Sequence, residues 1–245
     1  MKKSYIIIGV VVIVMLVAIG IYAVINSNSQ SKKQLEENST NIEGTTNTEN
    51  STKENNTENK DEYIQNNQIS NESEENNMYS TGKHHAEIVV KNYGTIVLEL
   101  DADVAPITVE NFANLVNEGF YNGLTFHRII SGFMIQGGDP LGNGTGGSSK
   151  TIKGEFASNG VKNSISHVRG TISMARSSMP NSASSQFFIV HQDSTFLDGQ
   201  YAAFGTVTSG MEVVDKICAD TAVEDDNGTV AKNNQPVIEK ITIID

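Results

Sequence analysis

Cysteine, tryptophan and proline are scarce in this sequence, whose 245 residues include one Cys, no Trp and four Pro. A single thiol cannot form an intrachain disulfide, so the folded part must be held together by its hydrophobic core alone. The only cysteine, Cys218, also lies far beyond the apolar run at the N-terminus. This position excludes an N-terminus anchored through a lipid-modified cysteine.

Positive charge is scarce as well. Residues 26–82 carry 4 Lys against 11 acidic residues, and residues 83–245 carry 11 Lys and Arg against 18 acidic residues, a net charge of −7 for each segment. Proteins bind nucleic acids through surfaces whose Lys and Arg neutralise phosphates. We therefore predict no nucleic-acid partner.

Several motifs of catalytic and cofactor sites are missing. The Gly-rich segment Leu141–Ser149 lacks the Lys-Ser or Lys-Thr that closes a phosphate-binding loop. The adjacent His84 and His85 belong to no His-Glu-x-x-His pattern or cysteine pair. The Gly-x-Ser-x-Gly elbow of many hydrolases is absent too. These absences predict no metal site, no cofactor and no hydrolase.

The chain begins with an apolar run. Lys2 and Lys3 precede about 20 residues, Tyr5 to Ile25, that are rich in Ile and Val, and about 20 apolar residues suffice for a helix to cross a bilayer. Because the two lysines stay in the cytoplasm, residues 1–25 predict a single-pass anchor in the cell membrane, with the rest of the chain extracytoplasmic. The alternative is a cleaved signal peptide, which would leave the protein secreted.

Residues 26–82 have a different composition. They are rich in Asn, Ser, Thr and Glu; 14 of the 57 residues are Asn and none is Pro. Such a segment buries too little apolar surface to offset the entropy lost on ordering. We predict a disordered acidic linker that holds the next domain away from the membrane.

Residues 83–245 contain the signals of a folded domain. Two short alternating segments, Ala86–Lys91 and Thr95–Asp101, indicate a hairpin. Many short strands with only two helical patterns favour a mainly β domain with a closed, antiparallel architecture. Further strands are predicted within 126–140, at 170–176, at 186–190 and at 237–244.

Two helices are predicted in this domain. The first opens at Pro106 and closes at Gly119. The second covers Gly210–Ile217. Apolar residues fall on one face of each helix, so both are expected to cap the sheet. The stripe residues are Val109, Phe112, Ala113 and Val116 in the first helix, and Met211, Val214 and Ile217 in the second.

Arg128 stands out because it is a charge within an aromatic and β-branched stretch, Phe126–Pro140. A cation in apolar surroundings is rarely buried without a partner, so a polar ligand resting on an apolar floor would explain it. The alternative is an edge-strand arginine whose stem lies along the sheet and whose head is in water.

The chain resembles cyclophilin-type peptidyl-prolyl cis-trans isomerases over about residues 84–245. Five blocks of sequence carry this resemblance, in the order and spacing of that family. The resemblance implies an eight-stranded antiparallel β-barrel capped by two α-helices. The blocks are Phe126–Ile130, Gly132–Pro140, Ser173–Arg176, Ser185–Ile189, and Phe196–Gly199 followed by Phe204-Gly205.

The resemblance also implies an activity and a site. Isomerases of this family accelerate rotation about Xaa-Pro bonds, whose barrier of about 18–20 kcal/mol comes from C–N double-bond character. It implies that Arg128 donates to the prolyl nitrogen, and that proline-containing segments of unfolded or exported proteins are the partners. The remaining implied substrate-binding residues are Phe133, Met134, Gln136, Ala175, Arg176, Gln186, Phe188, Phe196, Leu197 and Tyr201.

Some neighbouring residues are expected to be structural. Phe126, Phe187 and Phe204 suit the barrel core, and His127 suits a hydrogen-bonded structural histidine rather than an acid or base. A second interpretation of the whole domain is a chaperone module that binds proline-containing segments with little turnover. Phe196 stands where many eukaryotic members have Trp, which implies only weak binding of cyclosporin, an inhibitor of the family.

Overall fold

The computed structural model describes residues 78–245, which belong to one compact unit of the chain. The predicted anchor, residues 1–25, and residues 26–77 of the predicted linker lie outside the described residues. Within residues 78–245, no helix combines the length and the apolar character needed to cross a membrane.

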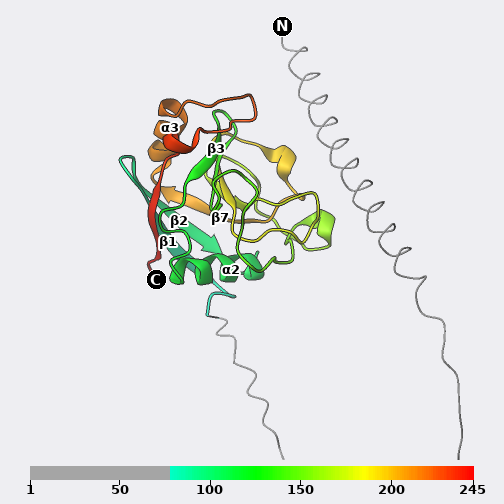
Figure 1. Ribbon diagram of the computed structural model, residues 1–245. Coiled ribbons are helices and arrows are strands. Elements are labelled where there is room, and N and C mark those ends of the chain that lie inside the picture. Colours follow the sequence, from blue (N-terminus) through cyan, green and yellow to red (C-terminus); the bar gives the residue numbers. More distant parts are fainter. Residues whose placement is uncertain (1–77) are drawn as a thin grey trace, which may run out of the picture. The chain divides into compact units, whose positions relative to one another are not determined.

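The described unit is mainly β (Figure 1). Its sheet has the strand order β3-β4-β6-β5-β7-β2-β1-β8 and every ladder is antiparallel. The strands are β1 Lys83–Val90, β2 Gly94–Asp101, β3 Phe126–Ile130, β4 Met134–Gly137, β5 Thr171–Met174, β6 Phe187–Val190, β7 Ala203–Ser209 and β8 Ile238–Ile243. The helices are α2 Pro106–Asn117 and α3 Met211–Asp220, and the 3-10 turns are η1 Ala157–Asn159, η2 Thr195–Leu197 and η3 Lys232–Asn234.

The sheet curls until its two edge strands approach each other. An isolated bridge joins Thr125 to Val237, beside β3 and β8, and Phe126 N–H donates to the Pro236 carbonyl at 2.9 Å. Two more backbone hydrogen bonds flank it, from Gly123 N–H to the Ile238 carbonyl and from Ile238 N–H to the Leu124 carbonyl, each at 2.8 Å. In the described residues the edges meet only over this short segment, so in place of the predicted closed barrel the structure has an eight-stranded curled sheet. Figure 1 shows α2 and α3 at opposite ends of it.

The core is filled by aromatic rings from distant parts of the chain. Phe112 of α2 packs against Tyr121, Phe187 and Phe204, with ring centroids 5.2, 5.7 and 5.3 Å apart. All four side chains, and that of Phe126, are fully buried. The predicted core role of Phe126, Phe187 and Phe204 is therefore confirmed.

The two predicted helices are confirmed, with small differences. The predicted stripe of α2 is buried from Val109 to Val116. The second helix, α3, starts at Met211 and continues to Asp220, three residues beyond its predicted end. Its buried face includes Val213 beside Val214 and Ile217.

Cys218 lies on α3 beside a small cavity that Ile129, Ile130 and Val223 also line. Burial raises the pKa of its thiol to about 11, so at neutral pH Cys218 is a protonated, unreactive thiol.

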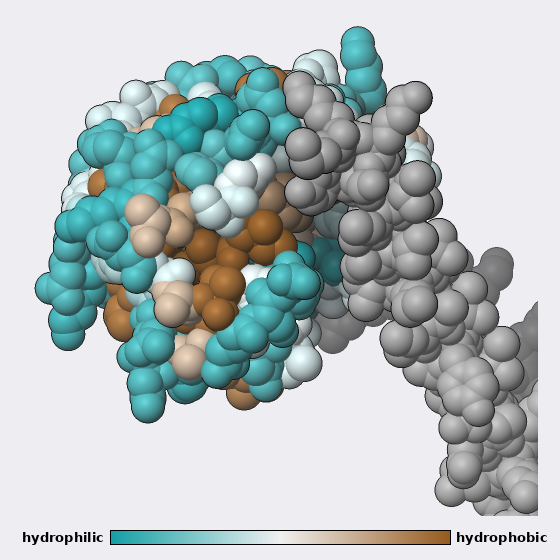
Figure 2. Space-filling view, turned by 90° about the horizontal axis from the view of Figure 1, so that it is seen from above, coloured by the Kyte–Doolittle hydropathy of each residue, from teal (hydrophilic) through white to brown (hydrophobic). Residues whose placement is uncertain are grey.

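Figure 2 views the molecule from above Figure 1, the side on which α3 lies, and shows apolar residues gathered in a hollow ringed by hydrophilic ones.

The N-terminus of α2 is capped from another part of the chain. Ala105, at the N-cap, supplies no side-chain hydrogen bond. The buried carboxylate of Glu155 accepts instead from the amides of Ile107 and Thr108 at 3.1 and 2.8 Å, and from the Thr108 hydroxyl at 2.7 Å. An anion at this end of a helix is favourable because the free N–H groups and the helix dipole both point toward it.

We expect Glu155→Ala to lower the free energy of unfolding by about 2 kcal/mol, because three donors lose a charged acceptor in a buried place. Urea titration of residues 78–245 would measure the change. Glu118→Ala, at the exposed other end of α2, is the matched control and should change stability by less than about 0.5 kcal/mol. Equal effects of the two substitutions would contradict the capping role.

Candidate functional site

Arg128 lies on edge strand β3, directly opposite Gln136 of β4. Its guanidinium is held by three hydrogen bonds: Nε donates to the Asn227 carbonyl at 2.8 Å, Nη2 to the Asn227 side-chain oxygen at 3.1 Å, and Nη1 to Gln136 Oε1 at 3.3 Å. All three acceptors are neutral. The head of Arg128 is therefore fixed by the protein, unlike that of an edge-strand arginine extended into water.

Partial burial lowers the pKa of Arg128, yet a guanidinium stays protonated at any physiological pH. Of its five N–H donors, three are used by Asn227 and Gln136. Two N–H groups have no hydrogen-bond acceptor within residues 78–245. Arg128 is thus a preoriented cation that can donate to one more group.

An apolar cluster lies next to this cation in the sheet. It consists of buried Met134, Phe188, Val190 and Leu197, and it is separate from the main core. Four partly buried residues pack against it, namely Ile130, Phe133, Ala175 and Tyr201. The structure therefore brings together most of the apolar residues that the resemblance implied for a proline pocket.

Phe196 lies at the margin of the apolar cluster. Its side chain is 64% exposed, and its ring centroid is 5.6 Å from that of Phe133. Phe188 and Tyr201 meet edge to face with centroids 5.9 Å apart. Phe196 and Tyr201 thus extend the cluster toward solvent.

The polar residues form a chain of hydrogen bonds along the site. Gln136 Nε2 donates to Gln186 Oε1 at 2.9 Å, and Gln186 Nε2 donates to the Gly146 carbonyl at 2.7 Å. Ala175 N–H donates to the Gln186 carbonyl at 2.9 Å. Through these bonds the amide of Gln136, next to Arg128, is tied to the Gly-rich loop.

The side chain of Arg176 packs between two aromatic rings. Its guanidinium carbon lies 4.9 Å from the Phe156 ring centroid and 4.7 Å from that of Tyr201. Both Nε and Nη2 donate to the Gln200 carbonyl, at 3.1 and 2.8 Å. The side chain of Arg176 thus braces Tyr201, and only its backbone is left for a substrate.

Asn227 is a site residue that the sequence did not indicate. It lies 99 positions after Arg128, in a loop before β8. The loop is a tight turn in which Asp225 accepts from the Thr229 amide and hydroxyl, and Gly228 has a φ of +80°. The dipeptide Asn227-Gly228 is a turn signal, but nothing in it shows that the turn meets Arg128.

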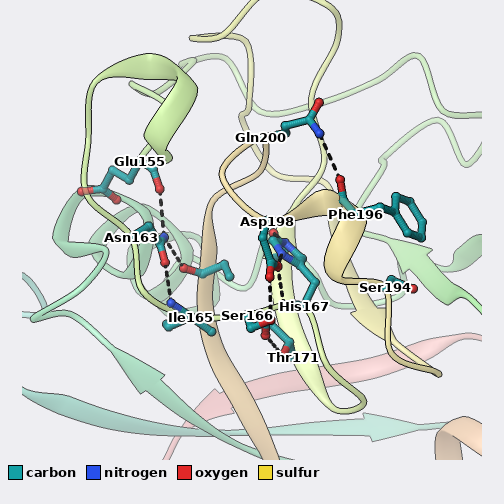
Figure 3. Close-up of polar contacts among 12 residues, drawn as sticks. Glu155, Asn163, Ile165, Ser166, His167, Thr171, Ser194, Phe196, Asp198 and Gln200 are labelled. Carbon is teal, nitrogen blue, oxygen red and sulfur yellow. Dashed lines mark hydrogen bonds and ion pairs between the residues drawn. The ribbon is translucent and has the colours of Figure 1, made fainter.

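A hydrogen-bonded network around His167 supports Phe188. Figure 3 shows His167 with its partner Asp198, which also accepts from Ser166. The His167 ring stacks on Phe188 with centroids 6.0 Å apart. Its Nδ1 lies 2.9 Å from Asp198 Oδ1 and its Nε2 lies 3.0 Å from Ser173 Oγ. This order of groups is that of a Ser-His-Asp triad, but both Ser173 and His167 are fully buried. No substrate can reach them, so the network is structural.

The charge states of this network follow from its contacts. Burial lowers the pKa of His167, against the pull of Asp198. Burial alone would raise the pKa of Asp198, but hydrogen bonds from Ser166 and His167 outweigh it and lower that pKa. At neutral pH the network is therefore a neutral imidazole held by a carboxylate.

A second network holds the backbone of Phe133. Gly132 N–H donates to His191 Nδ1 at 2.8 Å, and His191 N–H donates to the Phe133 carbonyl at 2.9 Å. His191 Nε2 lies 3.1 Å from Asp215 Oδ1, which places Asp215 of α3 behind the turn. Arg169 braces both, because it donates to the His191 carbonyl and to Asp215 Oδ2, each at 2.8 Å. No motif in the sequence indicates that these residues support the site.

His127 differs from its prediction. It is buried, with 4% of its surface exposed, so its structural position is confirmed. Its two ring nitrogens, however, have no hydrogen-bond partner, so the expected satisfied histidine is wrong. Burial lowers its pKa, and the nearby Arg128 and Lys232 act in the same direction against Asp139. The ring is therefore neutral at physiological pH.

Comparison with known proteins identifies the relatives of this domain. Residues 85–244 match the family model of the cyclophilin type peptidyl-prolyl cis-trans isomerases. A probable peptidyl-prolyl cis-trans isomerase of Brucella suis is 46% identical over 158 residues, covering 60% of this chain and 76% of that protein. Peptidyl-prolyl cis-trans isomerase B of Bacillus subtilis is 50% identical over 117 residues, covering 48% of this chain and 78% of that protein.

The fold has a solved counterpart. The crystal structure of a Cryptosporidium parvum cyclophilin type isomerase, determined in the presence of the dipeptide Ala-Pro, superimposes with a TM-score of 0.58 at 32% sequence identity. The match covers 66% of this chain and 99% of that one. The curled sheet with its two helices is therefore a cyclophilin-like fold.

The lowered pKa values of His127 and His167 predict how stability depends on pH. In the unfolded chain both side chains return to a pKa of about 6.5, so the unfolded state binds more protons below that pH. The free energy of unfolding should therefore fall between about pH 7.5 and about pH 5. Urea titrations across this range would measure it. His127→Gln removes one of the two groups and should flatten the curve; an unchanged slope would contradict this account.

Proposed function

This chain belongs to the cyclophilin-type peptidyl-prolyl cis-trans isomerase family and has peptidyl-prolyl cis-trans isomerase activity; we propose that it acts through Arg128 on Xaa-Pro bonds of extracytoplasmic proteins and so assists their folding. One observation supports this role above the others. Arg128 is a fixed cation with two donors to spare, and it lies beside an apolar cluster that includes Phe133, Met134, Phe188 and Leu197.

The role of Arg128 follows from the chemistry of the prolyl bond. In the planar ground state the nitrogen lone pair is delocalised into the carbonyl, and it accepts no hydrogen bond. As the bond twists, the nitrogen becomes pyramidal and regains a lone pair. A donor placed at this nitrogen binds the twisted state more strongly than either planar isomer, which is the condition for lowering the barrier.

The hydrogen bonds around Arg128 make such a contact effective. Asn227 and Gln136 hold the guanidinium before the substrate arrives, so no reorganisation is required during rotation. One charge-assisted hydrogen bond in a partly desolvated site contributes about 2–4 kcal/mol. Exclusion of water around the twisting bond adds to this contribution.

We assign the proline ring to the apolar cluster. Phe133, Met134, Phe188 and Leu197 would form its floor, and Tyr201 its rim. Burial of three ring methylenes contributes about 2 kcal/mol at about 0.8 kcal/mol for each group. This binding holds one side of the bond still while the other side rotates.

The polar chain of the site suits the extended part of the substrate. Gln136 would hydrogen-bond its backbone, and it would run along Ala175, Arg176 and Gln186. The side chain of Arg176 is fixed between Phe156 and Tyr201, which leaves the backbone of Arg176 available. Weak cyclosporin binding agrees with the exposed Phe196, because a phenyl ring lacks the N–H donor of an indole.

The location of the protein is a separate proposal. The apolar run from Tyr5 to Ile25, the preceding Lys2 and Lys3, and the acidic composition of residues 26–82 support a membrane anchor followed by a spacer. The isomerase domain would then act outside the cytoplasm, on exported chains near the membrane.

We expect Arg128→Ala to lower kcat/KM for a proline tetrapeptide by about 10²–10³-fold, because the twisted state loses its charged donor. Exchange NMR spectroscopy would measure the rate and also report peptide binding. Lys240→Ala, on exposed β8, is the control and should keep the wild-type rate. An unchanged rate in Arg128→Ala would contradict the role of Arg128. Peptide binding without measurable exchange in the wild type would favour the chaperone module.

N-terminal sequencing of the protein from membrane and medium fractions would test its location. Full-length chains that begin at Met1 and occur only in the membrane fraction are expected for a retained anchor. Chains in the medium that begin between Ala18 and the linker would show that the segment is a signal peptide. Exclusive recovery from the cytoplasm would contradict both.

A further inference from the structure

A cavity of about 510 Å³ lies behind Arg128 and Gln136, distinct from the apolar cluster. It shares those two side chains with the proposed catalytic site, but none of the residues of the proline pocket line it. Its opposite wall comes from the segment between α3 and β8, which contributes Asn227 and Lys232. The proposed isomerase mechanism makes no use of this cavity.

The charge of the cavity is opposite to that of the domain. Arg128 and Lys232 line it, and no Asp or Glu does, although residues 83–245 carry 18 acidic residues against 11 basic ones. Lys232 Nζ donates one hydrogen bond to the Leu141 carbonyl at 2.9 Å, and an ammonium has three N–H donors. The cavity thus combines two cations whose hydrogen bonds to the protein all go to neutral groups.

The carboxylates of Asp139 and Asp225, near the cavity, are held by hydrogen bonds within their own turns. Asp139 is buried, and its oxygens accept from the amides of Leu141, Asn143 and Gly144 at 2.8, 3.0 and 2.6 Å. Asp225 accepts from the amide and hydroxyl of Thr229 at 3.0 and 2.8 Å. Both carboxylates are occupied within their own turns, so neither neutralises the cavity by direct contact.

The buried wall of the cavity carries the unpartnered His127. Both ring nitrogens lack a hydrogen-bond partner, and the residue lines the cavity while only 4% of its surface is exposed. A neutral imidazole has one N–H donor and one acceptor. Both nitrogens are covered by protein, so the ring closes one wall of the cavity and the charged side chains, Arg128 and Lys232, are left to contact an occupant.

We propose that this cavity is a subsite for an acidic substrate side chain, Asp or Glu, within two residues of the isomerised Xaa-Pro bond. A carboxylate there would accept from Lys232, and Arg128 would add a second positive charge. A neutral amide would gain nothing from the two charges. The inference rests on the proposed function, because Arg128 belongs both to the cavity wall and to the catalytic site.

The test uses matched proline peptides that carry Glu, Gln or Lys at each of the two positions before and after the proline. At low ionic strength, we expect kcat/KM of the domain to be about tenfold higher for the Glu peptide than for the Gln peptide at one position at least. The Lys peptide should have a lower kcat/KM than the Gln peptide. Added salt should reduce the preference, because charge attraction is screened. A Glu-to-Gln ratio near one at all four positions would overturn the subsite.

Variants of Lys232 identify the source of the preference. Lys232→Gln should reduce the Glu-to-Gln ratio severalfold, whereas Lys232→Arg, which keeps the charge, should retain it. Lys240→Gln removes an exposed lysine on β8 and should leave the ratio unchanged. A preference that survives in Lys232→Gln would contradict the assignment to this cavity. If the wild-type domain isomerised none of the peptides, Gln peptides included, the proposed function itself would be contradicted.

Discussion

The antiparallel pairing of β3 with β4 is the constraint on which the site depends. It sets Arg128 opposite Gln136, and the next pairing, β4 with β6, sets Gln136 opposite Phe188. Side chains that share one face of three adjacent strands therefore include the cation, the amide and part of the apolar floor. A shift of one residue in either ladder would reverse the faces and separate them.

Arg128 also illustrates how a charge can be kept available. If a carboxylate were its partner, an ion pair would compete with any substrate for the guanidinium. The chain holds it instead with the neutral oxygens of Asn227 and Gln136, which orient the group without neutralising it. The same arrangement leaves the cavity behind Arg128 positive in an acidic domain, so catalysis and the choice of substrate can share one cation.

Both phenylalanines in the floor of the proposed proline pocket have a supporting network. Phe188 rests on the buried His167, which Asp198 and Ser173 hold. The turn before Phe133 is held by His191, which connects it to Asp215 on α3. Preorganisation of this kind requires residues that never touch the substrate. They are ordinary in sequence, so no motif identifies them.

Local patterns in the sequence determined the secondary structure and the family of this protein. Alternation and turn residues predicted the strands, the apolar stripes predicted α2 and α3, and five short blocks predicted the family and a set of candidate site residues. Such features depend on neighbours in sequence, which is why they can be read from it. Only the tertiary structure decided which distant groups meet: Glu155 at the start of α2, Asn227 at Arg128, and the two edges of the curled sheet over a short segment. It also left His127 buried without partners. These contacts join residues about 50 to 100 positions or more apart, and the chain brings them together only when the whole sheet has formed.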